Sequence, residues 1–325
     1  MKRSLLALFA ALTFVLAGCS SSDSDDATKI RFALDWTPNT NHTGLYVALH
    51  EGYFEDAGLD VEVLPYNDTN PDVLVDAGKA EFGVGFQEST MKSMAQGADV
   101  KSVLAVMQRW ASEISVLANR DDIQSPKDLD GKTYGGFGEE DSALVSGVIQ
   151  AAGGKGDFET VTLGTTAYEA LYSGDVDFTI PFVAWEGIEA EERGVELKNF
   201  AYGDYGFPES YQVIILGNGT WLEKNPDEAK KFVQALQKGY QYSIDNPDEA
   251  AQMLQDENKD LLTDVEMLKK SQRMLAENFM LDDNGKFGRQ EEAQWAALAK
   301  FFEDKGLLDH VDDWSQHFTN AYLLD

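Results

Sequence analysis

The sequence predicts an α/β fold of two lobes joined by two crossings of the chain, a hinged clamshell. Strands and helices alternate in two separate regions, near residues 29–107 and 110–212. Two continuous apolar strands, at 100–107 and 211–216, are placed where the chain would pass between the regions. About 300 residues follow the N-terminal segment, which is long for a single domain. We therefore assign 29–107 plus 216–325, with the C-terminal helices, to one lobe and 108–215 to the other.

The first region begins with a period-two pattern, in which Ile30, Phe32 and Leu34 alternate with their neighbours. A turn cluster at 37–41 separates this strand from a helix that ends near Gly52, a residue suited to a helix C-terminus. The expected elements are strands at 29–35, 59–65 and 82–86 and helices at 44–51 and 72–77.

The second region repeats the order of strand and helix, and a helical region follows it from Pro226 to the end, with a new segment at Pro247. The expected elements are strands at 133–136, around Val161 and at 178–181, and helices at 141–152 and 166–172. In the helical region, four large side chains fit one face of a late helix and are expected in the core: Trp295, Leu298, Phe301 and Phe302.

The N-terminus predicts export. Lys2 and Arg3 precede an apolar run at 5–17 that is too short to span a bilayer, which is typical of a signal peptide at 1–18. The run ends in Leu-Ala-Gly-Cys, which resembles a lipobox, and Cys19 is the single cysteine of the chain. We expect an extracytoplasmic protein that is anchored to the membrane by a lipidated Cys19 through a polar tether at 19–28.

Charge and motifs exclude several functions. The chain carries 57 acidic and 26 basic residues, so its negative field repels nucleic acid. It lacks the motifs of P-loop, GxSxG and HExxH enzymes, and it has no cysteine cluster. The segment 282–285 falls short of a calcium loop and is expected to form a turn. No catalytic residue, cofactor or metal site is predicted.

Several stretches together carry a family resemblance. FALDWTPNTNHTGLYVA at 32–48 is the most specific of them, and the others are EGYF at 51–54, AGLDV at 57–61, AGKAEFG at 77–83, LDGKTYGG at 129–136 and WEGI at 185–188. They resemble the family shared by bacterial thiamine-pyrimidine binding proteins and fungal pyrimidine synthases, over about residues 29–245. The resemblance implies a periplasmic-binding-protein clamshell of type II.

Within this family the chain looks most similar to ThiY-type receptors. That likeness implies a substrate-binding lipoprotein of an ABC importer, which captures an aminopyrimidine such as formylaminopyrimidine and delivers it to permease subunits. The synthases of the family use a lysine that binds pyridoxal phosphate, a histidine and a cysteine-rich run. Gly85 and Ser89 occupy the first two positions here, and the run falls at 207–210 without a cysteine. A Schiff base needs an amine, so the resemblance favours a receptor over a synthase.

Residues at the carboxyl ends of strands are the candidate ligand contacts, because ligands bind there in α/β sheets. Each also has a structural interpretation: Trp36 as a core anchor, Asn39 in the turn, His42 in packing, and Trp185 and Glu186 at the start of a solvated helix. Gln87 follows a buried strand, and Tyr211 lies at the second crossing. The candidates in this group are Trp36, Asn39, His42, Gln87, Trp185, Glu186 and Tyr211.

The glycine loop at 134–138 adds Gly136 and Glu140 to the candidates. Such a loop before a helix can bind an anion. Three acids follow it, at 139–141, and they would repel an anion and satisfy the helix N-terminus themselves. We therefore expect a neutral or cationic ligand. A receptor for a sulfonate or another small aromatic solute remains the alternative on the same fold.

Overall fold

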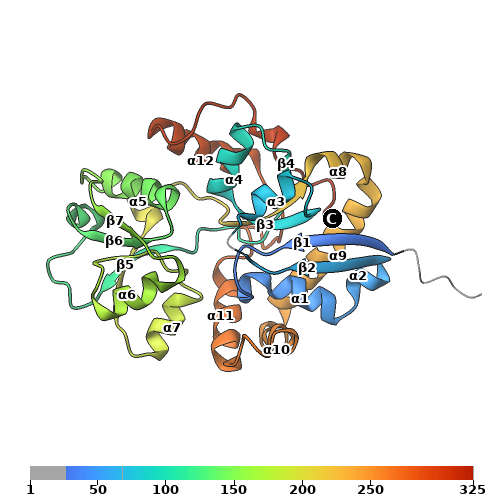
Figure 1. The fold of residues 1–325 in the computed structure, drawn as a ribbon, viewed down its shortest axis with the longest axis horizontal. Coiled ribbons are helices and arrows are strands. Elements are labelled where there is room, and N and C mark those ends of the chain that lie inside the picture. Colours follow the sequence, from blue (N-terminus) through green and yellow to red (C-terminus); the bar gives the residue numbers. More distant parts are fainter. Residues whose placement is uncertain (1–26, 68, 325) are drawn as a thin grey trace, which may run out of the picture.

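The computed structural model describes residues 27–67 and 69–324, without the side chains of Glu139, Glu140 and Thr165. Cys19, the signal peptide and most of the predicted tether therefore lie outside the described residues, as does the side chain of Glu140. The described chain forms two α/β lobes that lie side by side (Figure 1). We call the lobe built on the larger sheet the first lobe and the other the second lobe.

A five-stranded sheet in the order β2-β1-β3-β9-β4 is the centre of the first lobe. β1 is parallel to β2 and β3, whereas β9 is antiparallel to both β3 and β4. The chain thus leaves this sheet after β4 and returns as β9, which lies between β3 and β4, two strands that come much earlier in the sequence. The strands are β1 (Thr28–Ala33), β2 (Leu59–Leu64), β3 (Phe82–Phe86), β4 (Val100–Ala105) and β9 (Val213–Asn218).

Nine α-helices in the described chain pack around this sheet or follow it. The predicted helices at 44–51 and 72–77 are confirmed as α1 and α3, each within one residue of the expected start. The helical C-terminal region is also confirmed, with α9 and α10 beginning at Pro226 and Pro247. The helices are α1 (Thr43–His50), α2 (Tyr53–Asp56), α3 (Pro71–Asp76), α4 (Gln87–Ala95), α8 (Gly219–Lys224), α9 (Pro226–Asp245), α10 (Pro247–Glu257), α11 (Val265–Asn278) and α12 (Glu292–Asp304).

The second lobe contains two small sheets and three α-helices in its described residues. β5 pairs with β8 in antiparallel register, and β6 pairs with β7 in parallel register. The elements are β5 (Glu113–Leu117), β6 (Thr133–Gly136), β7 (Glu159–Thr162), β8 (Leu197–Ala201), α5 (Glu139–Ala151), α6 (Ala167–Ser173) and α7 (Glu186–Glu192).

The expected strand at 178–181 is not a regular strand. Its residues form isolated bridges, from Phe178 to Tyr134 of β6 and from Thr179 to Ser115 of β5. Pro181 has no N–H group to donate to a ladder, so the pairing is interrupted there and resumes only as a bridge between Phe182 and Ser112. The segment still connects the two small sheets and directs residues 182–186 toward the first lobe.

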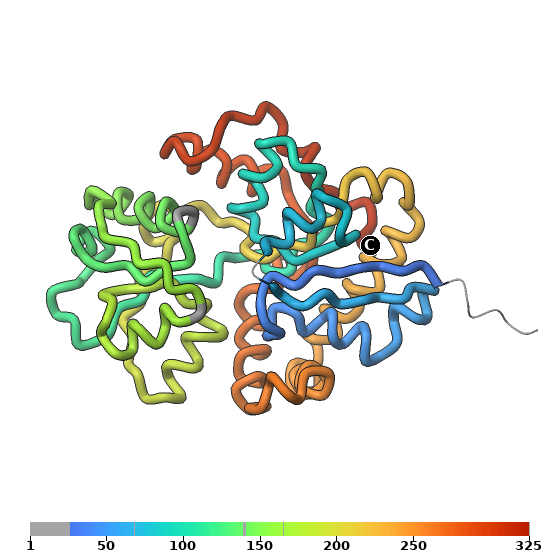
Figure 2. The backbone as a smooth tube through the Cα atoms, viewed as in Figure 1, coloured from blue at the N-terminus to red at the C-terminus, as the bar shows by residue number. Residues whose placement is uncertain are grey.

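The two apolar runs predicted as crossings are strands of the first sheet, β4 and β9, which pair with each other. Their continuous apolar character reflects burial on both faces, not a passage between lobes. The chain crosses just beyond them, after Ala105 and before Val213 (Figure 2). Gln212 links the two crossings, because its Oε1 accepts from the Ala111 N–H at 2.6 Å and its Nε2 donates to Ser112 Oγ at 2.6 Å.

Aromatic side chains fill the core of both lobes. Phe82 of β3 stacks on Phe232 of α9 with ring centroids 4.1 Å apart, and Phe54 stacks on the same ring at 5.2 Å. Trp295, Leu298 and Phe302 of α12 are buried, as predicted, whereas Phe301 is half-buried and packs against the edge of the core. The segment 282–285 is a turn, as expected.

Replacing Phe232 with alanine should lower the free energy of unfolding by about 3–5 kcal/mol, because it removes a ring packed between two others. Chemical denaturation monitored by circular dichroism measures this loss. Val73→Ala is the control, since Val73 is 58% exposed and its truncation should change stability by less than about 0.5 kcal/mol. Equal effects of the two substitutions would contradict the assigned core.

Candidate functional site

The loop after β1 is held in place by its own side chains. The Asn39 N–H donates to His42 Nδ1 at 3.2 Å, so His42 Nε2 carries the proton and donates to Asp35 Oδ1 at 2.7 Å. Asn39 Oδ1 accepts from the Asn41 N–H at 2.9 Å, and its Nδ2 donates to the Thr37 carbonyl. Asn39 and His42, both ligand candidates, are thus buried residues that fix the loop.

Helix α9 holds the same loop from behind. The Tyr240 hydroxyl donates to the Asn41 carbonyl at 2.7 Å. A Cβ at Gly239 would lie 2.0 Å from the Gly44 carbonyl, so α1 and α9 approach closely only because both residues are glycine. The position of Trp36 is therefore determined by packing deep in the first lobe.

Trp36 meets the second lobe through aromatic contacts. The half-buried ring of Trp36 lies edge-on to Phe137, with centroids 6.0 Å apart, and packs on Tyr66 of its own lobe at 5.4 Å. Phe137 in turn packs on Tyr168 at 6.1 Å. Phe86 and Phe182 make a second contact between the lobes at 6.2 Å. Aromatic rings of the two lobes thus meet at two places across the interface, and we call this set of rings the aromatic wall.

Glu186 is the buried acid of the second lobe at this interface. Its side chain accepts from the Phe182 N–H at 3.0 Å and from the Tyr168 hydroxyl. Burial raises the pKa of Glu186 to about 7, despite these two hydrogen bonds. At neutral pH the carboxyl group can therefore exist in either protonation state, and a bound cation or hydrogen-bond donor would favour the ionised one.

Trp185 does not accompany Glu186. Its ring is half-buried and packs against the apolar cluster of Ile188 with Leu254 and Leu268, from α10 and α11. The predicted tryptophan–glutamate pair therefore separates, with Glu186 at the aromatic wall and Trp185 between α7 and the helices of the first lobe.

Contacts at α11 fasten the second lobe to the loop that carries Trp36. Thr40 Oγ1 lies 2.6 Å from Ser271 Oγ, and Ser271 donates to the carbonyl of Ala184. Lys270 forms an ion pair with Glu191 of α7 at 2.7 Å. The buried hydrogen bonds from Thr40 through Ser271 to Ala184 thus connect the loop of Trp36 to the segment that precedes Glu186.

Gln87 and Tyr211 meet where the second crossing passes the end of β3. Gln87 Oε1 accepts from the Tyr211 N–H at 2.8 Å, and both side chains are completely buried. The Tyr211 hydroxyl accepts from the Glu291 N–H at 2.7 Å, so this hydroxyl joins the second crossing to the C-terminal region. Gln87 Nε2 has no hydrogen-bond partner among the described residues.

The glycine loop is closed to anions by its own acid. Asp141 Oδ2 accepts from the Phe137 N–H at 2.9 Å and from the Tyr134 hydroxyl at 2.5 Å. A Cβ at Gly136 would lie 2.2 Å from the Tyr134 ring and 2.7 Å from that carboxylate oxygen, which explains why glycine is required there. The carboxylate occupies the place in which a bound anion would accept hydrogen bonds.

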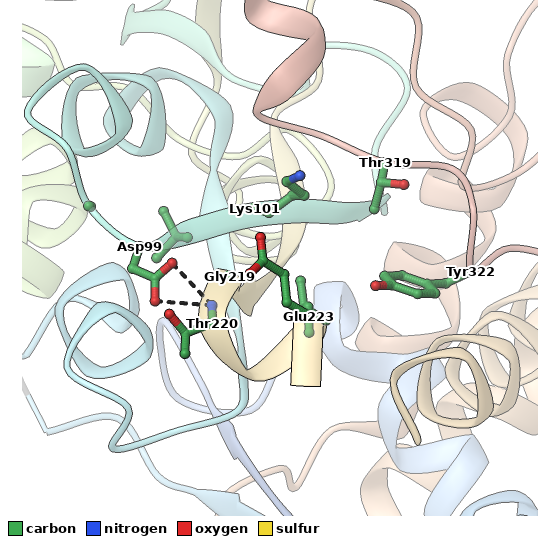
Figure 3. A pocket seen from close by; sticks show the side chains of 10 residues that line it. Asp99, Lys101, Gly219, Thr220, Glu223, Thr319 and Tyr322 are labelled. Carbon is green, nitrogen blue, oxygen red and sulfur yellow. Dashed lines mark hydrogen bonds between the residues drawn. The ribbon is translucent and has the colours of Figure 1, made fainter. Parts of the chain in front are cut away.

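Two pockets lie away from this interface. One of about 250 Å³ is lined by residues at the start of β4, after the end of β9 and near the C-terminus, among them Asp99, Lys101 and Glu223 (Figure 3). The ends of β4 and β9 at this pocket are those that point away from the crossings, and Asp99 accepts hydrogen bonds from the Thr220 N–H. The other pocket is lined by Ser142 and Ser146, whose hydroxyls donate to the carbonyls of Gly138 and Gly156.

Within the described part of the chain, no helix has the length and apolar character needed to cross a membrane. The same residues contain no cluster of histidine, cysteine or acidic side chains that could hold a metal ion.

The sequence matches the family described as NMT1/THI5 like over residues 39–250. The chain belongs to this family. The resemblance inferred from the motifs at 32–48 and beyond is thereby confirmed.

Two relatives of known role illustrate what this family contains. The chain is 31% identical to a formylaminopyrimidine-binding protein of Halalkalibacterium halodurans, over 94% of each chain. It is 26% identical to a 4-amino-5-hydroxymethyl-2-methylpyrimidine phosphate synthase of Saccharomyces cerevisiae, over 67% of this chain and 68% of the synthase. The family thus includes both binding proteins and enzymes.

Solved structures confirm the predicted fold class. The alkanesulfonate-binding protein SsuA of Xanthomonas axonopodis superimposes with a TM-score of 0.70 over 90% of this chain and 98% of that protein, at 14% identity. The chain therefore has the two-lobed fold of periplasmic binding proteins.

Replacing Glu186 with glutamine should flatten the pH dependence of stability. The folded-state pKa lies near 7, above the unfolded value of 4.5, so the contribution of Glu186 is fully present below pH 4.5 and lost as pH rises through 7. The variant should gain up to about 3 kcal/mol relative to wild type between pH 4.5 and pH 8. Urea denaturation at both pH values measures this difference. Glu192→Gln, on the exposed side of α7, is the control, and parallel curves for wild type and Glu186→Gln would contradict the assignment.

Proposed function

We propose that this protein is the extracytoplasmic receptor of an ABC importer, which captures a thiamine-related aminopyrimidine such as formylaminopyrimidine between its lobes. The main support is the meeting of Trp36 and Phe137, from opposite lobes, together with the buried Glu186, whose partner Tyr168 packs on Phe137. The likeness to a formylaminopyrimidine-binding protein over nearly the whole chain supports the same ligand class.

The chemistry of these groups suits a flat heterocycle that carries an amine. Aromatic rings from both lobes can stack on the faces of the ligand, and each good ring pair contributes about 0.5–1.5 kcal/mol beyond burial. Glu186 can accept hydrogen bonds from an exocyclic amine, and ionisation would strengthen them. Asn39 and His42 act by fixing Trp36, so we assign them positioning roles, together with Gly136 in the second lobe.

Capture would proceed by hinge closure. We propose lobes at 29–107 plus 216–325 and at 108–215, with the crossings linked by Gln212 acting as the hinge. The buried chain from Thr40 through Ser271 to Ala184 would form only when the lobes are closed. A ligand that contacts both lobes would therefore shift the population toward this conformation.

A synthase role is disfavoured by Gly85. A Cβ there would lie 2.7 Å from Leu216 Cδ1 and 2.8 Å from Thr90 Oγ1, so β3 and β9 leave no room for a lysine side chain. A sulfonate receptor is disfavoured by Asp141, which already accepts hydrogen bonds within the glycine loop. These two residues support a receptor for a neutral or cationic solute.

The place of the protein in the cell follows from the proposed role. A receptor that delivers solute to permease subunits must work outside the cytoplasmic membrane and remain near it. We propose that Cys19 is lipidated after removal of residues 1–18 and that the tether at 19–28 spans the gap between membrane and lobes.

Formylaminopyrimidine should raise the midpoint of thermal unfolding of the soluble chain that begins after Cys19, because a ligand that binds only the folded state stabilises it by mass action. Differential scanning fluorimetry against hydroxymethylpyrimidine, thiamine, taurine, riboflavin and pyridoxal phosphate tests the choice of ligand. A shift with taurine alone would move the proposal to the sulfonate alternative, and no shift with either pyrimidine would contradict it.

Trp36→Ala should weaken the binding of formylaminopyrimidine about tenfold, since stacking on one face is lost. Trp36→Phe should retain most of the affinity because it keeps an aromatic ring. Isothermal titration calorimetry measures both, and Glu223→Gln in the pocket of Figure 3 is the control that should bind as wild type does. Unchanged affinity in Trp36→Ala would place the ligand elsewhere.

A further inference from the structure

Four buried hydrogen-bonding groups near the two crossings have no partner among the described residues. They are Gln87 Nε2, Trp110 Nε1, the Tyr202 hydroxyl and Ser210 Oγ. Gln87 and Ser210 are completely buried, and Tyr202 is 1% exposed. A buried donor without an acceptor lowers stability, so a set of them in one place calls for an explanation.

These groups belong to one region. Gln87 accepts from the N–H of Tyr211, the residue that follows Ser210. The ring of Trp110 stacks on Tyr202 with centroids 5.7 Å apart, and Trp110 precedes Ala111, whose N–H donates to Gln212. Trp110 and Ser210 thus lie on the two crossing segments themselves, Gln87 is hydrogen-bonded to the second crossing at the end of β3, and Tyr202 packs on Trp110.

The type of each group limits what can bind there. An indole N–H and an amide NH₂ are donors only, and hydroxyl groups can also donate. Asp141 and Glu88 lie near Tyr202, and burial together with their negative charge raises the pKa of this tyrosine well above its usual value. The hydroxyl therefore keeps its proton, and an anion would meet like charge. A neutral acceptor, such as the carbonyl oxygen of an amide, fits both conditions.

This region is also connected to the aromatic wall. Asp141, which lies near Tyr202, accepts from the N–H of Phe137, and Phe137 contacts Trp36. The loop that carries Phe137 thus links Trp36 to the surroundings of Tyr202, one of the four unpartnered groups.

We propose that Gln87, Trp110, Tyr202 and Ser210 form a donor subsite that binds a neutral carbonyl group of the ligand. The inference rests on the proposed function and deepens it, because it adds a requirement to the aminopyrimidine class. The ligand presents donors to Glu186 and a carbonyl acceptor to the hinge. Formylaminopyrimidine carries such a carbonyl group, and hydroxymethylpyrimidine lacks it.

The test compares Tyr202→Phe and Trp110→Phe with wild type by calorimetric titration of both pyrimidines. Each substitution keeps an aromatic ring and removes one unpartnered donor. Affinity for formylaminopyrimidine should fall about tenfold in each variant, and the preference for it over hydroxymethylpyrimidine should shrink by the same factor. The unliganded Tyr202→Phe protein should unfold at the same temperature as wild type or higher, because its lost hydroxyl had no partner.

Trp314→Phe is the matched control, because Trp314 Nε1 is also buried without a partner but packs on Trp295. It should leave both affinities unchanged. If wild type prefers formylaminopyrimidine and Tyr202→Phe and Trp110→Phe keep that preference, the donors hold structural water only; the subsite is then wrong and the proposed function stands. If wild type binds neither pyrimidine, the proposed function fails and the subsite fails with it.

Discussion

The return of the chain into the first sheet as β9 is the constraint on which the rest of the structure depends. Because β9 pairs with β3 on one side and β4 on the other, both crossings must pass the carboxyl end of β3. Gln87 stands at that end, and its hydrogen bond with the Tyr211 N–H ties the first lobe to the second crossing. This topology therefore places both crossings, with Gln87 and Tyr211, at the same end of the first sheet.

The contacts between the lobes differ in what they contribute to closure. Lys270 and Glu191 form an ion pair between side chains that are 39% and 69% exposed, and such pairs contribute little in water. The hydroxyl of Ser271 is buried, so its contacts with Thr40 and Ala184 hold the lobes in one relative position. The relative orientation of the two lobes therefore depends on buried hydrogen bonds more than on surface ion pairs.

The sequence predicts the fold well because its signals are local. Alternating apolar residues, prolines at helix starts and the motif at 32–48 predicted most elements, the family and the two-lobed architecture. It misplaced the crossings, because an apolar run buried within a sheet and an apolar linker look alike in sequence. The segment 178–181 has the apolar pattern of a strand, but in the structure it forms only isolated bridges because Pro181 interrupts its pairing.

The candidate site was less accessible from the sequence. Position after a strand predicted Trp36 and Glu186, which lie at the interface between the lobes, but the same rule gave Asn39 and His42, whose hydrogen bonds lie within the loop. No local pattern in the sequence pointed to Phe137, Tyr168 or Tyr202 as interface residues. An aromatic residue is expected in the core unless its neighbours in space are known. The unpartnered donors depend on contacts between residues more than 100 positions apart, such as Gln87 with Tyr211.

A crystal structure of the protein with formylaminopyrimidine would show directly whether an aminopyrimidine binds between the lobes. We expect the pyrimidine ring to pack against Trp36 and Phe137, its amine to lie within hydrogen-bond distance of Glu186, and the lobes to be closed. A ligand bound in the pocket beside Asp99 and Glu223, or an empty interface in crystals grown at saturating ligand, would contradict this expectation.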